Sequence, residues 1–171
     1  MNGNLQLLEQ AQIAWGFGPV ELTSARTGDV VSMKGYRRCA IVFLKGIGTA
    51  GQDPTITVLQ GTDVAFGTNK ALNFTQLYTK EDLTTLADVG QWTKVTQSAA
   101  NTYTTTTSAE SALIWVIDFK AEDLDVANNY DCIRASVADV GTNTQLGAVL
   151  YILYDAVQCM APESMLSAIA D

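Results

Sequence analysis

The chain has 171 residues, which fits one domain better than two. Its 10 Lys and Arg stand against 18 Asp and Glu, and the formal net charge of −8 argues against a nucleic-acid-binding surface, which needs clustered cations. The sequence contains no His, so it lacks the Ser–His and Cys–His pairs of nucleophilic enzymes and the commonest general base.

The N-terminal segment, residues 2–15, has weak helical spacing of its apolar side chains, and Gly16 and Pro19 would end such a helix. No basic start followed by a long apolar stretch occurs in residues 1–25, so no secretion signal is expected. No run reaches the ~18 apolar residues of a membrane span. The large apolar residues must be buried either on their own domain or, as we favour, on a neighbouring molecule. Residues 1–25 are therefore interpreted as an N-terminal arm.

From Thr27 onward the pattern changes to β-strands separated by turn-forming residues. Residues 39–44 are apolar at every position, which predicts that both faces of this strand are covered. In residues 112–119 alternate apolar side chains form one face, and Ile114 and Val116 cover much of the other. About nine strands are expected, at 28–33, 36–47, 55–60, 71–78, 92–97, 103–107, 112–119, 130–137 and 145–154.

The connecting segments have distinct patterns. Residues 80–90 are expected to form a polar, acidic loop, and residues 121–129 one helical turn followed by a loop. Residues 162–171 form an amphipathic stretch whose opening Pro and Glu suit a first helical turn. The strand at 71–78 alternates, with one face formed by Leu72, Phe74, Gln76 and Tyr78.

This strand spacing predicts an all-β fold, an antiparallel β-sandwich or jelly-roll-like domain with short terminal helical arms. A single domain is expected over residues 1–171, with the sandwich core at 26–155 and a C-terminal arm at 156–171. The predicted core contains Ile41, Phe43, Leu113, Trp115, Ile117, Ile133, Leu150 and Ile152. The predicted interface residues of the two arms are Leu5, Leu8, Ile13, Trp15, Met165, Leu166 and Ile169.

No constellation of catalytic residues is recognised. The motifs GxSxG, GxGxxG, GxxxxGK[ST] and HExxH are absent, and most acidic residues fall in loops, where they are normally solvated. We therefore expect no enzyme, with no catalytic residues, no cofactor-binding residues and no cofactor. A metal site is not expected, although a calcium-binding loop stays open as an alternative at residues 118–131, which carry Asp118, Glu122, Asp123, Asp125 and Asp131 with Asn128 and Asn129.

The three cysteines are Cys39, Cys132 and Cys159, an odd number without close spacing or a CxxC pair. A disulfide framework or a zinc site is therefore not expected. Cys39 and Cys132 lie in strand-like runs, where a free thiol behaves as a small apolar group. This usage fits assembly in a reducing cytoplasm.

Two further groups have a structural and a functional interpretation. The only basic cluster is Lys34, Arg37 and Arg38, which fits a solvated strand start or an interface ion pair better than an anion site. Exposed aromatic side chains can form a platform for sugars, although aromatic residues on strands are more often core or interface anchors. The candidates for such a platform are Trp92, Tyr103 and Tyr78.

The order and character of the strands resemble a known family. The segments that carry the resemblance are VVSMKGYRRCAIVFLKG at 30–46, TITVLQGTD at 55–63, KALNFTQLY at 70–78, SALIWVIDFKAEDLDV at 111–126, YDCIRASV at 130–137 and AVLYILY at 148–154. Together they cover most of residues 28–155 and resemble small structural proteins of tailed bacteriophages, of the kind encoded near the major capsid gene. The likeness lies in the succession of β-strands and includes no catalytic motif.

The resemblance implies a virion protein, and within that class a capsid decoration or cement protein that stabilises the assembled head shell. The implied partners are the phage major capsid protein and further copies of this chain, without nucleic acid or membrane. The implied location is the capsid surface, after synthesis in the host bacterial cytoplasm. The alternatives are a tail-tube, neck or head–tail connector subunit, and a β-sandwich module that binds host glycans.

Overall fold

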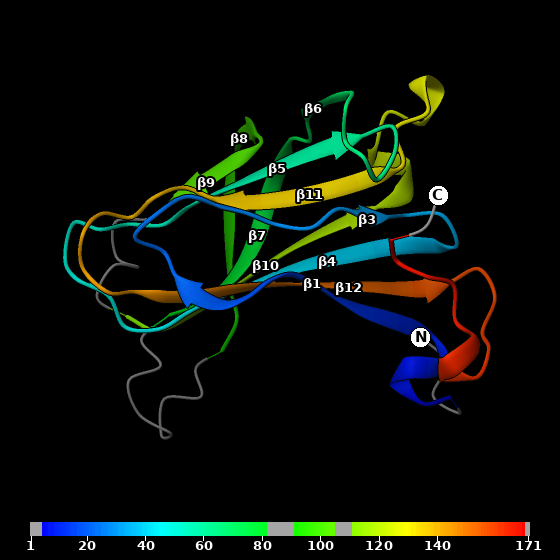
Figure 1. The fold of residues 1–171 in the computed structure, drawn as a ribbon, viewed down its shortest axis with the longest axis horizontal. Coiled ribbons are helices and arrows are strands. Elements are labelled where there is room, and N and C mark those ends of the chain that lie inside the picture. Colours follow the sequence, from blue (N-terminus) through cyan, green and yellow to red (C-terminus); the bar gives the residue numbers. More distant parts are fainter. Residues whose placement is uncertain (1–4, 82–90, 105–110, 170–171) are drawn as a thin grey trace.

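The chain folds into two antiparallel β-sheets packed face to face (Figure 1). The computed structural model describes residues 5–81, 91–104 and 111–169. The first sheet, sheet A, has the strand order β1 (Ala11–Glu21), β12 (Leu146–Ala156), β4 (Tyr36–Lys45), β10 (Leu113–Lys120), β7 (Phe74–Glu81) and β8 (Thr93–Ala100). The second, sheet B, has the order β2 (Arg26–Thr27), β11 (Cys132–Val137), β5 (Thr55–Gly61) and β6 (Asn69–Ala71), with β3 (Val31–Ser32) also on β11 and β9 (Thr102–Thr104) also on β5.

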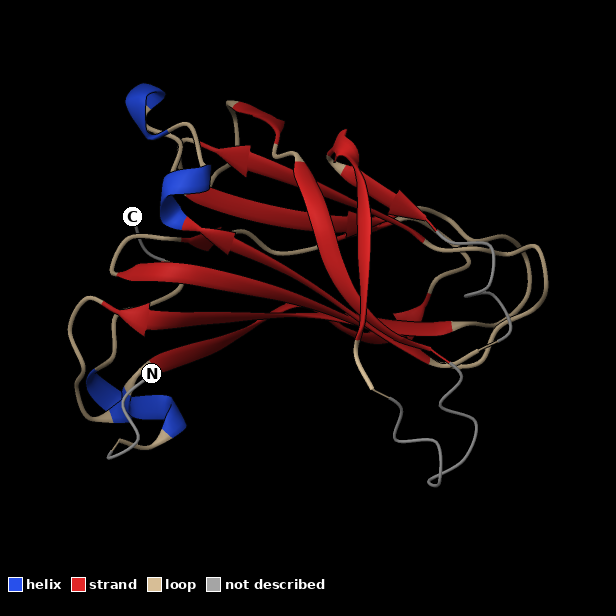
Figure 2. Ribbon diagram, turned by 180° about the vertical axis from the view of Figure 1, so that it is seen from behind, coloured by secondary structure: helices blue, strands red, loops and turns tan. Residues whose placement is uncertain are grey.

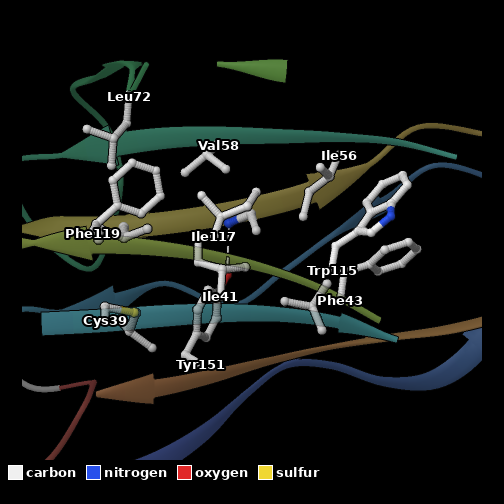
Figure 3. Close-up of a cluster of buried hydrophobic side chains, with 14 of the residues drawn as sticks. Cys39, Ile41, Phe43, Ile56, Val58, Leu72, Trp115, Ile117, Phe119 and Tyr151 are labelled. Atoms are coloured by element: carbon white, nitrogen blue, oxygen red, sulfur yellow. Dashed lines mark hydrogen bonds between the residues drawn. The ribbon is translucent and has the colours of Figure 1, made fainter. Parts of the chain in front are cut away.

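The core lies between the sheets and is built by alternation along the central strands. Trp115 of β10 is registered with Phe43 of β4, and Ile117 with Ile41, so these four side chains share the inner face of sheet A. All four are at most 1% exposed, and Figure 3 shows them stacked below the side chains of sheet B. The predicted sandwich and these core residues are confirmed, as are Leu113 and Ile133.

One hydroxyl group links the two sheets through the core. The Oη of Tyr151 on β12 accepts a hydrogen bond from the backbone N–H of Ala135 on β11, at 2.8 Å, and donates one to the carbonyl of Asp29, at 3.0 Å. Ala135 lies between the stretches of β11 that pair with β3 and with β2, so neither short strand supplies a partner at this position. The tyrosine therefore completes the hydrogen bonding of sheet B from the opposite sheet.

The predicted orientation of β12 is wrong by one residue. Leu150 and Ile152 were expected in the core, but they are half-buried on the outward side of sheet A. Val149, Tyr151 and Leu153 occupy the core instead, each 0% exposed. The segment from Ala148 to Tyr154 is apolar or aromatic throughout, so its own alternation does not distinguish the two faces, and pairing with β4 decides the orientation.

The helix expected at residues 2–15 is also wrong. A single 3-10 turn, η1 (Leu7–Glu9), is followed by the long strand β1, which pairs with β12 along its length. The helical spacing was weak, and a short isolated helix is marginal in water, so the backbone partner offered by β12 prevails. Register shifts on either side of Phe17 bend the strand.

Most remaining strands appear close to their expected positions, with local differences. The strand predicted at 71–78 is divided between β6 in sheet B and β7 in sheet A. A register shift between Phe74 and Gln76 changes the alternation, so that Gln76 and Tyr78 point outward and Leu77 points inward. Of the strand predicted at 28–33, only β3 forms. The turn at 121–129 is observed as η2 (Ala121–Asp123) and η3 (Val126–Asn128). Residues 82–90 of the predicted acidic loop and 105–107 of a predicted strand lie outside the described residues.

The C-terminal segment packs on its own domain near the start of β4. Only η4 (Pro162–Ser164) is helical in the amphipathic stretch expected at 162–171. The backbone N–H of Ser32 donates to the carbonyl of Ala168 at 2.7 Å, and the Tyr36 hydroxyl donates to the carbonyl of Leu166 at 2.7 Å. Ala168 is 5% exposed and joins the core. Among the described residues, no helix has the length and apolar character needed to span a membrane.

Candidate functional site

The outward side of sheet A is apolar across five neighbouring strands. Strand pairing places Trp15, Leu150, Val42, Val116 and Tyr78 in one row, because directly paired residues of antiparallel strands point to the same side. The rows on either side contain Ile13, Ile152 and Ala40, and Ala148, Leu44 and Ile114. We call these eleven residues the outer face.

The outer face lacks a covering layer in the described part of the chain. Trp15 is 54% exposed, Ile13 42% and Tyr78 40%, while Val42 and Leu150 are half-buried only by their neighbours on the sheet. In Figure 2, the sandwich has sheet B on one side of sheet A, and the short helical turns lie at one end of the strands. Eleven positions, spaced about 4.8 Å between strands and about 7 Å along them, give an area on the order of 350 Å². The largest apolar patch on a monomer has about this size and is often functional.

A shallow apolar pocket of about 380 Å³ lies at one end of the outer face. Its walls come from β4, β10 and β12, with Pro19 of β1 closing one side. The proline lacks a backbone N–H, so it also interrupts the hydrogen-bonding edge of β1. The pocket lining includes Leu44, Ile114, Leu146 and Ala148, so the pocket continues the outer face without a polar boundary.

At the opposite end, a hydrogen-bonded group of polar side chains bounds the outer face. Arg38 of β4 forms an ion pair with Asp118 of β10, and its Nε donates to the hydroxyl of Tyr154 on β12, at 2.7 Å. The Tyr154 hydroxyl in turn donates to the Asp118 carboxylate, at 2.9 Å. The hydrogen bond to Asp118 raises the pKa of Arg38, and burial together with the bond to Asp118 raises the pKa of Tyr154. Arg38 therefore stays charged and Tyr154 neutral near neutral pH.

Two lysines flank the outer face at its β7–β8 side. Lys80 is registered with Ile114 and lies over the ring of Trp92, with its Nζ 4.9 Å from the ring centroid. Lys94 is registered with Tyr78 and is exposed. The ring of Trp92 is itself 48% exposed. The apolar surface is thus bordered here by cationic and aromatic groups.

A groove of about 490 Å³, lined by both polar and apolar side chains, opens between β7 and β10. The two strands pair from Leu113 to Val116 on β10, and no pairing with β7 follows for Ile117–Lys120. The groove is lined by neutral polar groups such as Asn73 and Gln76 and by the rings of Phe74 and Phe119. Its charged lining residues are Arg38, Asp118, Lys120 and Asp123, of which Arg38 and Asp118 pair with each other.

The predicted interface residues fall into two groups. Ile13 and Trp15 lie together on the outer face, and Leu8 is 46% exposed on η1. Leu166 and Ile169 are 42% and 63% exposed, but Leu166 contacts Gly35 in the turn before β4 and so lies away from the outer face. Figure 1 shows η1 and η4 at the same end of the sandwich, whereas Ile13 and Trp15 lie along β1. The remaining two predicted residues, Leu5 and Met165, are half-buried.

The largest part of the outer face was not singled out from the sequence. Val42, Val116 and Leu150 lie in runs that are apolar at consecutive positions, and such runs predict strands covered on both sides. One side of sheet A is covered by sheet B, and the described residues provide no cover for the other. The continuous apolar pattern was therefore the available signal for an intermolecular surface.

The acidic stretch 118–131 does not gather its carboxylates at one point. Asp118 pairs with Arg38, Glu122 with Lys120, Asp125 with Lys70 and Asp131 with Lys34, and Asp123 accepts a hydrogen bond from the backbone N–H of Lys120. In the described residues, no group of three His, Cys, Asp or Glu side chains has the spacing to hold a metal ion. The geometry favours separate ion pairs over a calcium loop.

The three aromatic candidates for a sugar platform are separated. Tyr103 packs edge-on against Trp115, with ring centroids 4.9 Å apart, and belongs to the core packing. Tyr78 and Trp92 remain on the outward side of sheet A.

Cys39 and Cys132 are buried and form no disulfide with each other. Burial raises the pKa of Cys39, which makes this thiol unreactive.

Comparisons with known proteins give little beyond this geometry. No family model matches the chain, and no curated protein matches it. Among solved structures, the crystal structure of the SPBc2 prophage-derived protein YomS is similar, with a TM-score of 0.41 and 13% sequence identity. The similarity covers 82% of this chain and 92% of that chain. A likeness at this level carries no argument, so the function is argued from the outer face itself.

Proposed function

We propose that this chain is a non-enzymatic structural protein of a phage virion that attaches to the assembled head shell as a decoration or cement protein. The observation that carries the proposal is the outer face, an apolar surface on the order of 350 Å² with Trp15 and Ile13 at its exposed side. The resemblance of the strand succession to phage head-region proteins supplies the virion context.

The size of the outer face suits contact with another protein. A stable protein interface buries about 800 Å² on each partner, with an apolar centre and a polar rim. The outer face supplies somewhat less than half of that area, as its centre. The group formed by Arg38, Asp118 and Tyr154 supplies part of the rim, with its charges already paired. Burial of this surface requires little desolvation of isolated charges.

A decoration protein acts in many copies on one particle. Binding to the assembled shell and not to free subunits stabilises the shell by mass action. Modest contacts of each copy then sum to a large effect. A low charged fraction of 16% is consistent with a surface made for lasting contact, although Thr-rich β-sandwiches share this composition.

The experiment compares particles of the encoding phage with and without this protein. Particles lacking it should release DNA at a lower temperature, and adding back the purified protein should restore the difference. The variant Ile13→Ser on the outer face should fail to restore it. The matched control is Val157→Ser, which removes a branched apolar side chain that is also exposed (58%, against 42% for Ile13) outside the outer face, and this variant should restore the difference fully.

The alternative position is the tail tube, neck or connector, where an apolar sheet face would also be buried between subunits. Copy number per particle separates the two, because hundreds of copies favour decoration and six or twelve favour a neck. If particles lacking the protein hold their DNA equally well on heating but fail to attach tails, the decoration proposal is wrong.

A further inference from the structure

We propose that the outer face binds a protein surface with an apolar centre and a carboxylate-bearing rim. This inference rests on the proposed function and names the chemistry of the shell surface that the chain recognises. It depends on how charge is distributed over the molecule, which the net charge alone conceals.

Cations are concentrated around the outer face although the chain is acidic. The four rows of sheet A that run through Arg38, Ala40, Val42 and Leu44 contain four cations and one carboxylate. The described residues include all 10 cations and 14 of the 18 acids, so these rows hold four of the ten cations and one of those 14 acids. The five charged residues in these rows are Arg38, Lys80, Lys94, Lys120 and Asp118.

The two lysines at the β7–β8 side carry the recognition. Arg38 is paired with Asp118, and Lys120 with Glu122 at 3.0 Å. The ion pairs recorded between described residues do not include Lys80 or Lys94. Lys80 lies over Trp92, and Lys94 is exposed beside Tyr78, so both ammonium groups border the apolar rows. A partner that covers the apolar rows brings its own rim against these two ammonium groups.

Charge complementarity argues for a carboxylate-bearing partner. The other sides of the molecule carry the excess of negative charge, so an acidic shell surface repels them and attracts only the outer face. Attachment is thereby oriented as well as stabilised. Rim charges of this kind act mainly on the rate of association and on its salt dependence.

Two other occupants fit less well. A second copy packed face to face would bring an outer face with four cations and one acid against another of the same composition. An anionic lipid surface would meet a sheet whose central side chains are half-buried, and among the described residues two lysines of these rows, Lys80 and Lys94, take part in none of the ion pairs. A protein surface with a carboxylate-bearing rim matches both the apolar rows and the charge.

The test measures the association rate of purified protein with particles that lack it, at 0.1 M and 1 M salt. Lys94→Glu should lower the rate at 0.1 M about 3- to 10-fold, and the loss should shrink at 1 M, where the screening length falls to about 3 Å. Lys34→Glu is the matched control, because it changes the net charge equally but at a lysine paired with Asp131, away from the outer face. It should stay within about twofold of the wild type.

Each other outcome has a definite meaning. In one outcome, wild-type protein binds, Ile13→Ser does not, and Lys94→Glu and Lys34→Glu bind at the same rate. The proposal of a carboxylate-bearing rim on the partner is then wrong, and the proposed function stands. If wild-type protein does not bind at all, both proposals fail. Dimerisation in light scattering that Ile13→Ser abolishes would replace the shell by a second copy. Sedimentation with vesicles of phosphatidylcholine and phosphatidylserine, lost in Lys94→Glu, would replace it by a membrane.

Discussion

The hydroxyl of Tyr151 gives a sharp test of how the two sheets are held together. The substitution Tyr151→Phe keeps the ring, which is 0% exposed, and removes only the oxygen that bonds the Ala135 N–H and the Asp29 carbonyl. Because the ring stays, no large cavity forms. The change therefore isolates the hydrogen bonds that cross the core.

The expected loss of stability follows from those two bonds. Each net hydrogen bond contributes about 1 kcal/mol, and a buried N–H left without a partner costs about 1–3 kcal/mol. The Ala135 N–H lies in the core and has no strand partner on that side, so the penalty applies to it in full. We expect the free energy of unfolding to fall by about 2–3 kcal/mol, which corresponds to a decrease in Tm of about 4–12 °C at this chain length.

Urea unfolding followed by tryptophan fluorescence measures this loss. The control is Tyr154→Phe, three residues along the same strand, whose hydroxyl bonds Asp118 and Arg38 at the solvent-facing end of the outer face. Because water can replace that hydroxyl, we expect a loss below about 1 kcal/mol. If Tyr151→Phe costs no more than Tyr154→Phe, the hydroxyl does not stabilise the contact between the sheets.

Three further predictions concern the core, pH dependence and the N-terminus. Trp115→Ala removes ring contacts with Phe43 and Tyr103, at centroid distances of 5.2 and 4.9 Å. The free energy of unfolding measured in urea should fall by about 3–5 kcal/mol, and a fall below about 1 kcal/mol would contradict the packing. Burial lowers the pKa of Lys45 from 10.5 to about 8. Between pH 8 and pH 10.5 the unfolded chain therefore binds more protons than the folded chain. The charged lysine destabilises the fold most below pH 8, where it is protonated in both states. Lys45→Met should therefore raise the free energy of unfolding by up to about 3 kcal/mol at pH 7, with the gain shrinking from pH 8 to 10.5; a gain independent of pH would refute the cause. Deleting residues 1–9 should leave circular dichroism and Tm nearly unchanged, whereas deletion to residue 15 also removes Ile13 and Trp15 and should abolish attachment to particles. Unfolding of the variant that lacks residues 1–15 would instead show that pairing of this part of β1 with β12 is needed for the fold.

The inner face of the sandwich could be predicted where polar residues mark the alternation. In β10, Asp118 and Lys120 follow Val116 on the outward side, which fixes Leu113, Trp115 and Ile117 inward. In β12, no charged residue occurs between Leu146 and Tyr154, so the face assignment failed there. The decisive information is the pairing with β4, a contact distant in the sequence.

The N-terminal strand shows the same limit of prediction from a local pattern of residues. Leu5, Leu8 and Ile13 suggested a helix, but Ile13 is registered with Ile152 of β12. A strand at a sheet edge is determined by the partner it finds, and the partner lies far along the chain. For the candidate site, Ile13 and Trp15 were predicted as interface residues of an arm; both are exposed, and their interface role stays a prediction. The helical arm was wrong, because the two residues lie on a strand.

The strand order of sheet A has a consequence for how the protein matures during translation. The central strand β4 lies between β12 and β10, both of which are synthesised much later, and β1 pairs with β12 alone. The outer face therefore cannot form on a nascent chain before residues 146–156 have left the ribosome. Until then β1 and β4 lack this shared partner, and pairing between strands so distant in the sequence is slow. A chain interrupted before β12 is consequently unable to form the outer face.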